Sequence, residues 1–285
     1  MILVLHNNDL GAKNFEQYLE KNKIHYVSIS LQDIVKDTKI FDTFSTQTSK
    51  CIWKFKECEI DFDNVSGIYN CISYLTLEHL IDFTPEDRHY VKNEWWAYLI
   101  YRINNSHNVI NPISEAMSSG MINQFPFIYN NASTLGFKTP KYYISQSTEE
   151  LLELANDLQR YISKSITYFD NSFRESSSIN DDTISLIEYL PGNILYVHLI
   201  DEQIWCSIYK NGTVYQYEMD KANKDRCYKM ALLLGIRKCE FIFKQEKDGN
   251  LALYYVSAHP NLSKAHESYI EQIYKTIYEK LSSSK

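Results

Sequence analysis

The fold is decided by residues 235–262, which read GIRKCEFIFKQEKDGNLALYYVSAHPNL. Two parts of this stretch are apolar and rich in aromatic and β-branched residues, which predicts two strands. Asp248 and Gly249 stand between them, and this dipeptide is typical of a hairpin turn. The second predicted strand runs out into His259, Pro260 and Asn261. We therefore expect a β-hairpin near the C-terminus that ends in a polar segment.

Composition and charge exclude several classes of protein. The 285-residue chain has a formal net charge of −7 and no run of basic residues, so no electrostatic argument favours nucleic acid. No segment reaches about 18 consecutive apolar residues, so no membrane-spanning helix is predicted. The start MILVLHNND predicts a first strand rather than a signal peptide. Six scattered cysteines form no C-x-x-C pair and fit no zinc pattern, which predicts reduced thiols in a cytoplasmic protein.

The first third of the chain predicts a small α/β unit. Residues 2–5, 12–21 and 26–31 indicate a β-α-β opening, and residues 51–62 alternate like a hairpin. Pro85 opens a predicted helix that runs to about Asn104, because proline suits the first helical position. The apolar residues of this helix recur every four positions and form one buried stripe. The stripe consists of Val91, Trp95, Leu99 and Ile103.

The rest of the chain predicts helices first and then mainly strands. Helices are expected over residues 117–135, with a break near Pro126, and over 149–160. Strands are expected over residues 161–168, 183–190, 194–200, 203–209 and 214–219, and helices over 221–234 and 264–281. This order predicts an α+β protein of three lobes. We place the lobes at residues 1–112, 113–190 and 191–285.

Four phrases and the C-terminal hairpin resemble the ATP-grasp superfamily. The phrases are VSGIYNCIS (65–73), HYVKNEWWAYLIYRINNSHNVINP (89–112), NNASTLGFKTPKYYIS (130–145) and LIEYLPGNILYVHLIDEQIWCSIY (186–209). In order and spacing they are similar to ligases of the RimK type and to the microviridin-type and grasp-with-spasm maturases of ribosomally made peptides. The resemblance covers nearly the whole chain, and it implies a three-lobed fold that binds ATP and magnesium between two lobes.

The resemblance also implies which residues would bind the nucleotide. Lys164 matches the phosphate-binding lysine of the central lobe, although a lysine on an edge strand is an alternative interpretation. Glu188, Tyr189 and Leu190 match the hinge, whose backbone binds adenine in this superfamily. An ordinary strand end before Pro191 is the alternative there.

Other positions depart from the superfamily pattern. The phosphate lysine of the linker is replaced near Gln124 or Phe125, and the arginine after the hinge is replaced by Tyr196. The magnesium ligands are replaced by Ile242, Ser257 and His259, although Glu240 would substitute for the first in another register. The phosphate loop, over residues 168–182, contains no glycine.

Three functions follow as hypotheses. The first is a degenerate ATP-grasp-like protein that binds a precursor peptide or a maturation enzyme, with little or no ligase activity and no certain cofactor. The alternative is an active, divergent ligase that uses ATP and magnesium, with Lys164 on phosphate, residues 188–190 on adenine, and Glu240 with His259 on the metal. A structural or assembly protein is the third, and a homodimer is left open.

A transition-metal site is the weakest of the interpretations of the histidines. His198, His259 and His266 could join Glu240 around a metal, but surface or core histidines are several times more common than ligands. We therefore predict no metal site.

Overall fold

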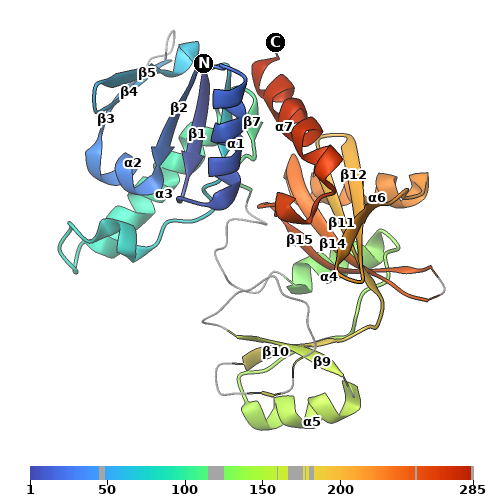
Figure 1. The fold of residues 1–285 in the computed structure, drawn as a ribbon. Coiled ribbons are helices and arrows are strands. Elements are labelled where there is room, and N and C mark those ends of the chain that lie inside the picture. Colours follow the sequence, from blue (N-terminus) through green and yellow to red (C-terminus); the bar gives the residue numbers. More distant parts are fainter. Residues whose placement is uncertain are drawn as a thin grey trace.

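The computed structural model describes residues 1–44, 49–114, 125–158, 160–165, 176, 178–179, 183–247 and 249–283. This part of the chain forms three lobes of mixed helices and strands (Figure 1). The predicted α+β class and its three-lobed architecture are confirmed.

The N-terminal lobe is built on a parallel sheet in the order β2-β1-β6-β7. Its strands are β1 (Ile2–His6), β2 (Tyr26–Ser30), β6 (Gly67–Asn70) and β7 (Val109–Ile110). Helix α1 (Leu10–Lys21) connects the first two strands, as the β-α-β opening predicts.

A short helix and a strand that the sequence did not predict follow β2. Helix α2 (Leu31–Asp37) begins at the N-cap Ser30, whose Oγ accepts a hydrogen bond from the backbone N–H of Asp33 at 3.1 Å. Strand β3 (Thr38–Phe44) then pairs with the predicted hairpin of β4 (Ser49–Phe55) and β5 (Cys58–Asp61). The capping serine was a signal for α2 that the strand pattern obscured.

Helix α3 (Arg88–Asn104) begins three residues later than predicted. Pro85 lies in the preceding turn, where the backbone N–H of Asp87 donates to the Thr84 carbonyl at 3.0 Å. The predicted apolar stripe is confirmed, because Leu99 and Ile103 are fully buried and Val91 and Trp95 pack partly buried against the same core.

The middle lobe is a small sheet in the order β8-β10-β9. Its strands are β8 (Tyr142–Ile144), β9 (Tyr161–Ser165) and β10 (Thr183–Glu188). Helix α5 (Thr148–Leu158) covers one face and packs on Leu186. The opposite face carries Ile162 and Ile187, which join the core of the C-terminal lobe.

The C-terminal lobe contains an antiparallel sheet in the order β13-β12-β11-β14-β15. The predicted hairpin is confirmed as β14 (Lys238–Gln245) and β15 (Leu251–Ser257); Asp248 lies outside the described residues. The other strands are β11 (Asn193–Ile200), β12 (Gln203–Lys210) and β13 (Thr213–Gln216).

Two helices cover one face of this sheet. Helices α4 (Phe125–Thr134) and α6 (Lys221–Leu233) contribute Ile128, Ala132 and Met230 to its core. Pro126 lies within the first turn of α4, where proline is tolerated. The predicted first half of that helix lies outside the described residues.

Helix α7 (Glu267–Ser282) leads from the C-terminal lobe back to the N-terminal one. Its buried residues Ile273, Ile277 and Leu281 share a core with Phe15 and Leu19 of α1. The two helices therefore run beside each other, and the chain ends close to its start (Figure 1).

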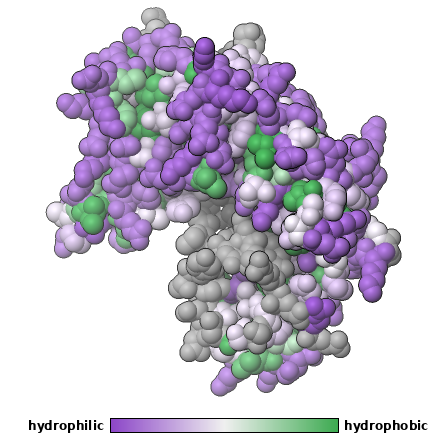
Figure 2. All heavy atoms as spheres, viewed as in Figure 1, coloured by the Kyte–Doolittle hydropathy of each residue, from purple (hydrophilic) through white to green (hydrophobic). Residues whose placement is uncertain are grey.

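The face of the molecule seen in Figure 2 is largely polar. On the face drawn in Figure 2, hydrophilic side chains dominate and the hydrophobic ones form small separate groups. Among the described residues, no helix combines the length and the apolar character that a membrane span needs.

Candidate nucleotide site

One face of the C-terminal sheet carries the positions at which the resemblance implies phosphate and metal ligands. Successive side chains of a strand alternate between faces, so Glu240 and Ile242 of β14 share one face with Lys244. Phe241 and Phe243 point the other way, into the core beneath α4 and α6. The candidate site is therefore the face that carries Glu240, Ile242 and Lys244.

The first row across this face is aromatic and aliphatic. Tyr196, Ile242 and Tyr255 lie side by side on β11, β14 and β15. Ile242 is 3% exposed, and burial raises the pKa of Tyr196 to about 12, so its phenol stays neutral at pH 7. The row offers neither a cation for phosphate nor a carboxylate for magnesium.

The second row across this face consists of polar, buried side chains. His198, Glu240 and Ser257 are register neighbours, and all three are buried. His198 Nε2 and Glu240 Oε2 are 3.1 Å apart but are not aligned as a hydrogen bond, and they form an ion pair when the imidazole carries a proton. Glu240, the predicted substitute for a magnesium ligand, thus already has a partner.

Ser257 is also engaged by its own chain. Its Oγ accepts from the backbone N–H of His259 and lies 3.1 Å from the His259 carbonyl, to which it donates. This local turn uses the hydroxyl that stands in the glutamate position. Because the hydroxyl is committed, it is a poor candidate for holding a cation.

His259 and Glu240 do not line the same cavity: His259 lines one with Lys238, and Glu240 is not among its lining residues. The His259 side chain retains solvent exposure in this cavity. Desolvation of the imidazole and then the Lys238 ammonium lower the pKa of His259 to about 4. His266 serves as the N-cap of α7. Within the described ranges, no group of three or more His, Cys, Asp or Glu side chains is arranged to hold a metal ion.

Lys164, the predicted phosphate ligand, is a buried residue of the middle lobe. It is 6% exposed on β9 and pairs across the sheet with Ser185 of β10. Both residues share the face of Ile162 and Ile187, which is the face that meets the C-terminal lobe. Gln124, the side chain of Phe125 and most of the predicted phosphate loop lie outside the described residues.

Two backbone groups of residues 188–190, the predicted hinge, are already hydrogen-bonded within the protein. The phenol of Tyr254 on β15 accepts from the backbone N–H of Leu190 at 2.6 Å and donates to the backbone carbonyl of Glu188 at 2.8 Å. Tyr254 is completely buried. Its hydroxyl thus makes the pair of hydrogen bonds, one donated and one accepted, that an adenine ring would make along a hinge.

Two cations lie against the remaining hinge residue. The Lys244 ammonium is 4.8 Å from the centroid of the Tyr189 ring, and the Arg160 guanidinium carbon is 4.4 Å from the same centroid. Lys244 is 4% exposed, and burial followed by the charge of Arg160 lowers its pKa. Sequence reasoning missed Lys244 and Tyr254, although strand alternation placed Lys244 on the face of Ile242.

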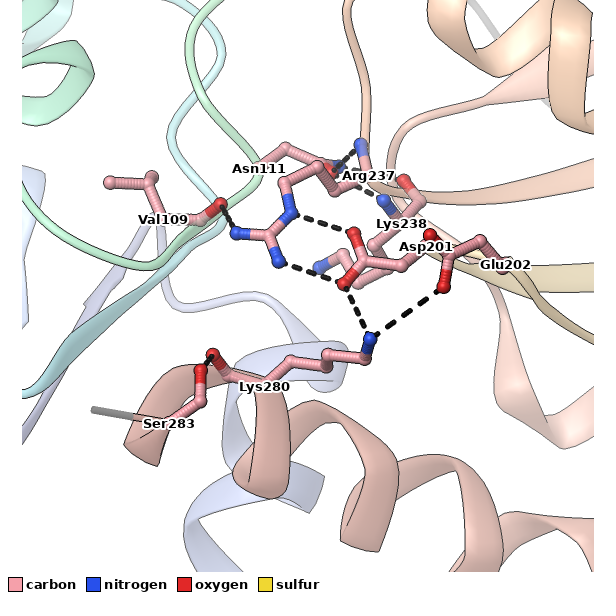
Figure 3. A network of polar contacts seen from close by, with 8 residues as sticks. All are labelled: Val109, Asn111, Asp201, Glu202, Arg237, Lys238, Lys280 and Ser283. Carbon is pink, nitrogen blue, oxygen red and sulfur yellow. Dashed lines mark hydrogen bonds and ion pairs between the residues drawn. The ribbon is translucent and has the colours of Figure 1, made fainter. Parts of the chain in front are cut away.

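The N-terminal lobe is hydrogen-bonded through Asn111 to the start of β14 and the end of β15. The Asn111 amide nitrogen donates to the carbonyls of Lys238 and Ala258, at 2.7 and 3.0 Å. Its oxygen accepts from the backbone N–H groups of Arg237 and Lys238, at 2.9 and 2.6 Å. Figure 3 shows Asn111 with Arg237 and Lys238, beside the Arg237–Asp201 pair. The start of β14 is therefore held in place from the N-terminal lobe.

Comparison with known proteins gives matches of structure only. No protein-family model matches the chain, and neither does any curated protein. Among solved structures, the macrocyclase MdnC bound with precursor peptide MdnA, from Microcystis aeruginosa MRC, is 13% identical, with a TM-score of 0.75 and 99% of each chain covered.

Two further structures extend the comparison. A RiPP-associated ATP-grasp ligase of Chryseobacterium gregarium, in complex with ADP and a leader and core peptide, is 11% identical, with a TM-score of 0.72 over 98% of this chain and 96% of that one. The D-alanine–D-alanine ligase of Bacillus anthracis, complexed with ATP, is 12% identical, with a TM-score of 0.55 over 98% and 94%. At these identities the likeness concerns the fold, and it extends from end to end: the chain has the ATP-grasp fold.

Proposed function

We propose that this chain is a degenerate ATP-grasp protein that binds a peptide or a partner enzyme in ribosomal-peptide maturation, with little or no ligase activity. The observation that carries the proposal is the double hydrogen bond of Tyr254 to the hinge. A nucleotide that used the same backbone groups would have to displace a fully buried tyrosine. It would then leave a phenol without its partners, which opposes binding.

The phosphate and metal positions support the same conclusion. Ile242 and Tyr196 supply no charge, Ser257 is bonded to the backbone of His259, and Glu240 pairs with His198. Phosphoryl transfer depends on cations and metal ions placed around the reacting phosphate, and the loss of one such contact typically raises the barrier by about 3 kcal/mol. Several losses together therefore leave little catalysis.

Peptide binding does not require those groups. Among the structural neighbours, MdnC was determined with a precursor peptide bound, and the Chryseobacterium gregarium ligase with a leader and core peptide. We infer that this chain retains a peptide-binding surface of the same general fold, by strand addition or by docking of a helix. The same surface would serve a maturation enzyme that presents an extended segment.

Two titrations test the proposal. Isothermal titration calorimetry with ATP and MgCl2 is expected to give no magnesium-dependent heat, whereas a cognate precursor peptide is expected to bind with micromolar or tighter affinity. A thermal shift provides the cross-check, since a ligand at ~100 times its Kd stabilises the folded state by about 2.7 kcal/mol. Magnesium-dependent ATP binding by the unaltered protein would contradict the proposal.

The active-ligase alternative rests on Lys164. Lys164 is 6% exposed on the face toward the C-terminal lobe, which supports a role as a phosphate ligand. On this alternative, peptide-dependent phosphate release would be measurable and Lys164→Ala would abolish it. Phosphate release that Lys164→Ala leaves unchanged, or no release at all, rejects this mechanism.

A further inference from the structure

A cavity lies where the N-terminal lobe, the end of β15 and helix α7 meet. Its volume is about 230 Å³, enough for roughly seven or eight water molecules at their liquid density. Asp9, Cys71, Lys238 and His259 line its polar side, whereas Ile273 and Ile277 of α7 line an apolar side. We propose that this cavity binds a small aliphatic α-amino acid, with its carboxylate on Lys238 and its ammonium on Asp9.

Lys238 is a buried cation without a carboxylate. Its side chain is 1% exposed, and its ammonium lies 4.1 Å from the Tyr69 ring centroid and 3.8 Å from Cys71 Sγ. No ion pair joins it to an acid in the described part of the chain. An aromatic face and a thiol compensate a buried charge only partly, and a buried ammonium normally has an anionic partner. The site is therefore short of one anion.

Cys71 does not supply that negative charge. Burial raises the pKa of its thiol to about 11, although the Lys238 ammonium acts in the opposite direction. The thiol is consequently protonated at pH 7. The backbone of Lys238 is held by Asn111, which bonds both its N–H and its carbonyl.

Asp9 is the acidic residue that lines the same cavity. As the N-cap of α1 it accepts from the backbone N–H of Ala12 at 2.8 Å through Oδ1. Its second oxygen, Oδ2, is buried and has no hydrogen-bond partner among the described residues. A buried carboxylate oxygen that is left unpaired is destabilising, and a ligand ammonium would satisfy it with a charge-assisted hydrogen bond.

The two charges face one cavity without touching each other. No ion pair connects Asp9 with Lys238, yet both charges act on the His259 ring. Asp9 raises the pKa of His259 and Lys238 lowers it. A ligand that bridges them needs an ammonium and a carboxylate a few bonds apart, which is the chemistry of an α-amino acid. The isoleucines of α7 favour an aliphatic side chain, and the volume lies below the roughly 300 Å³ at which pockets for drug-sized ligands begin.

Four compounds test this inference with the unaltered protein. L-Leucine should raise the thermal midpoint and give a saturable heat of binding. Leucinol and isopentylamine, which lack the carboxylate, and 4-methylpentanoate, which lacks the ammonium, should bind at least tenfold more weakly. Equal binding of 4-methylpentanoate and leucine, or no binding of leucine at millimolar concentration, overturns the proposal.

Two substitutions then assign the charges. Lys238→Met keeps an unbranched side chain one atom shorter and removes the ammonium, so it should abolish leucine binding. Asp9→Asn removes the charge but retains an N-cap of comparable quality, so it should abolish binding while α1 stays folded. Lys275→Met, on an exposed part of helix α7, is the matched control and should bind leucine normally.

Leucine binding that survives both cavity substitutions places the ligand elsewhere and rejects this site. The result is independent of the peptide and nucleotide titrations, so it can fail or succeed without them.

Discussion

Arg237 holds Asp201 with two parallel hydrogen bonds, from Nε and Nη2 to the two carboxylate oxygens, each 2.7 Å long. The same guanidinium donates to the Val109 carbonyl of the N-terminal lobe at 3.1 Å. Lys280 of α7 approaches the Asp201 carboxylate to 3.7 Å (Figure 3). One carboxylate thus joins the loop between β11 and β12, the start of β14 and helix α7.

Asp201→Asn is expected to destabilise the protein through this junction. It removes the charge that Arg237 and Lys280 share, and hydrogen bonds between charged groups typically contribute about 1.5–3 kcal/mol. Because the Asp201 side chain is only 14% exposed, solvent screens the pair weakly. Urea unfolding should show a lower midpoint with an unchanged slope.

Glu202→Gln is the matched control for that substitution. Glu202 also lies near Lys280, at 3.8 Å, but its side chain is 71% exposed. Exposed ion pairs contribute about 0–1 kcal/mol, so this variant should be nearly neutral. Equal effects of the two substitutions would mean that the junction does not stabilise the molecule.

Tyr254→Phe should cost about 1–3 kcal/mol of unfolding free energy, because it leaves the Leu190 N–H and the Glu188 carbonyl without their partner. Tyr215→Phe on β13 is the control, since that side chain is 51% exposed, and no measurable change is expected. Denaturant titration of both variants gives the comparison. If the unfolding free energy of Tyr254→Phe equals that of the unaltered protein within experimental error, the phenol does not hold the hinge.

His259 makes stability depend on pH in a defined direction. Its pKa in the folded protein is about 4, below the ordinary value near 6.5. Desolvation of the imidazole and the Lys238 ammonium lower this pKa, whereas the Asp9 carboxylate raises it. Below pH 6.5 the unfolded chain binds a proton that the folded protein does not. The contribution is therefore complete above pH 6.5 and is lost as the pH falls toward 4.

The measurement for this prediction is the thermal midpoint against pH. His259→Gln cannot titrate, so the difference between the unaltered protein and this variant should decline between about pH 6.5 and 4. In Lys238→Met the repulsion is absent, and the decline should begin at the same pH but be smaller. A pH-independent difference would show that His259 titrates normally in the fold.

The sequence predicted the elements whose patterns are long and regular. The hairpin of β14 and β15 and the apolar stripe of α3 follow from alternation and from a four-residue repeat, and both are confirmed. Helix α2 was missed because its apolar residues continue the pattern of β2, so that only the Ser30 cap separates the two elements. The start of α3 was placed at Pro85, but local turns before the helix hold that proline outside it.

The candidate site was less predictable for a different reason. The positions of Tyr196, Ile242, Ser257 and His259 could be counted from the resemblance, whereas the role of Tyr254 could not. Its hydroxyl reaches groups more than sixty residues away, and a tyrosine in an apolar strand reads as a core residue. Likewise, nothing in the sequence shows that Lys238 and Asp9 face one cavity, because that depends on how α1, β14 and α7 meet.

Gly67→Ala should prevent α7 from docking normally on the N-terminal lobe. An added Cβ would lie 2.3 Å from the Leu281 carbonyl oxygen and 2.8 Å from its Cα, closer than real contacts allow. The obstacle is backbone, so no side-chain rotation relieves it, and overpacking of this kind costs about 1–3 kcal/mol or more.

Gly11→Ala provides the comparison, because its Cβ would approach no atom more closely than 3.2 Å and alanine is the better residue inside a helix by about 0.5–1 kcal/mol. Equilibrium unfolding should show a clear loss for Gly67→Ala only. Hydrogen exchange should locate that loss in the amides of α7, since those bonds open when the helix leaves the lobe. Protection of α7 that is unchanged in Gly67→Ala would mean that β6 shifts to make room, and that the close approach of Gly67 to Leu281 is not what fixes the helix.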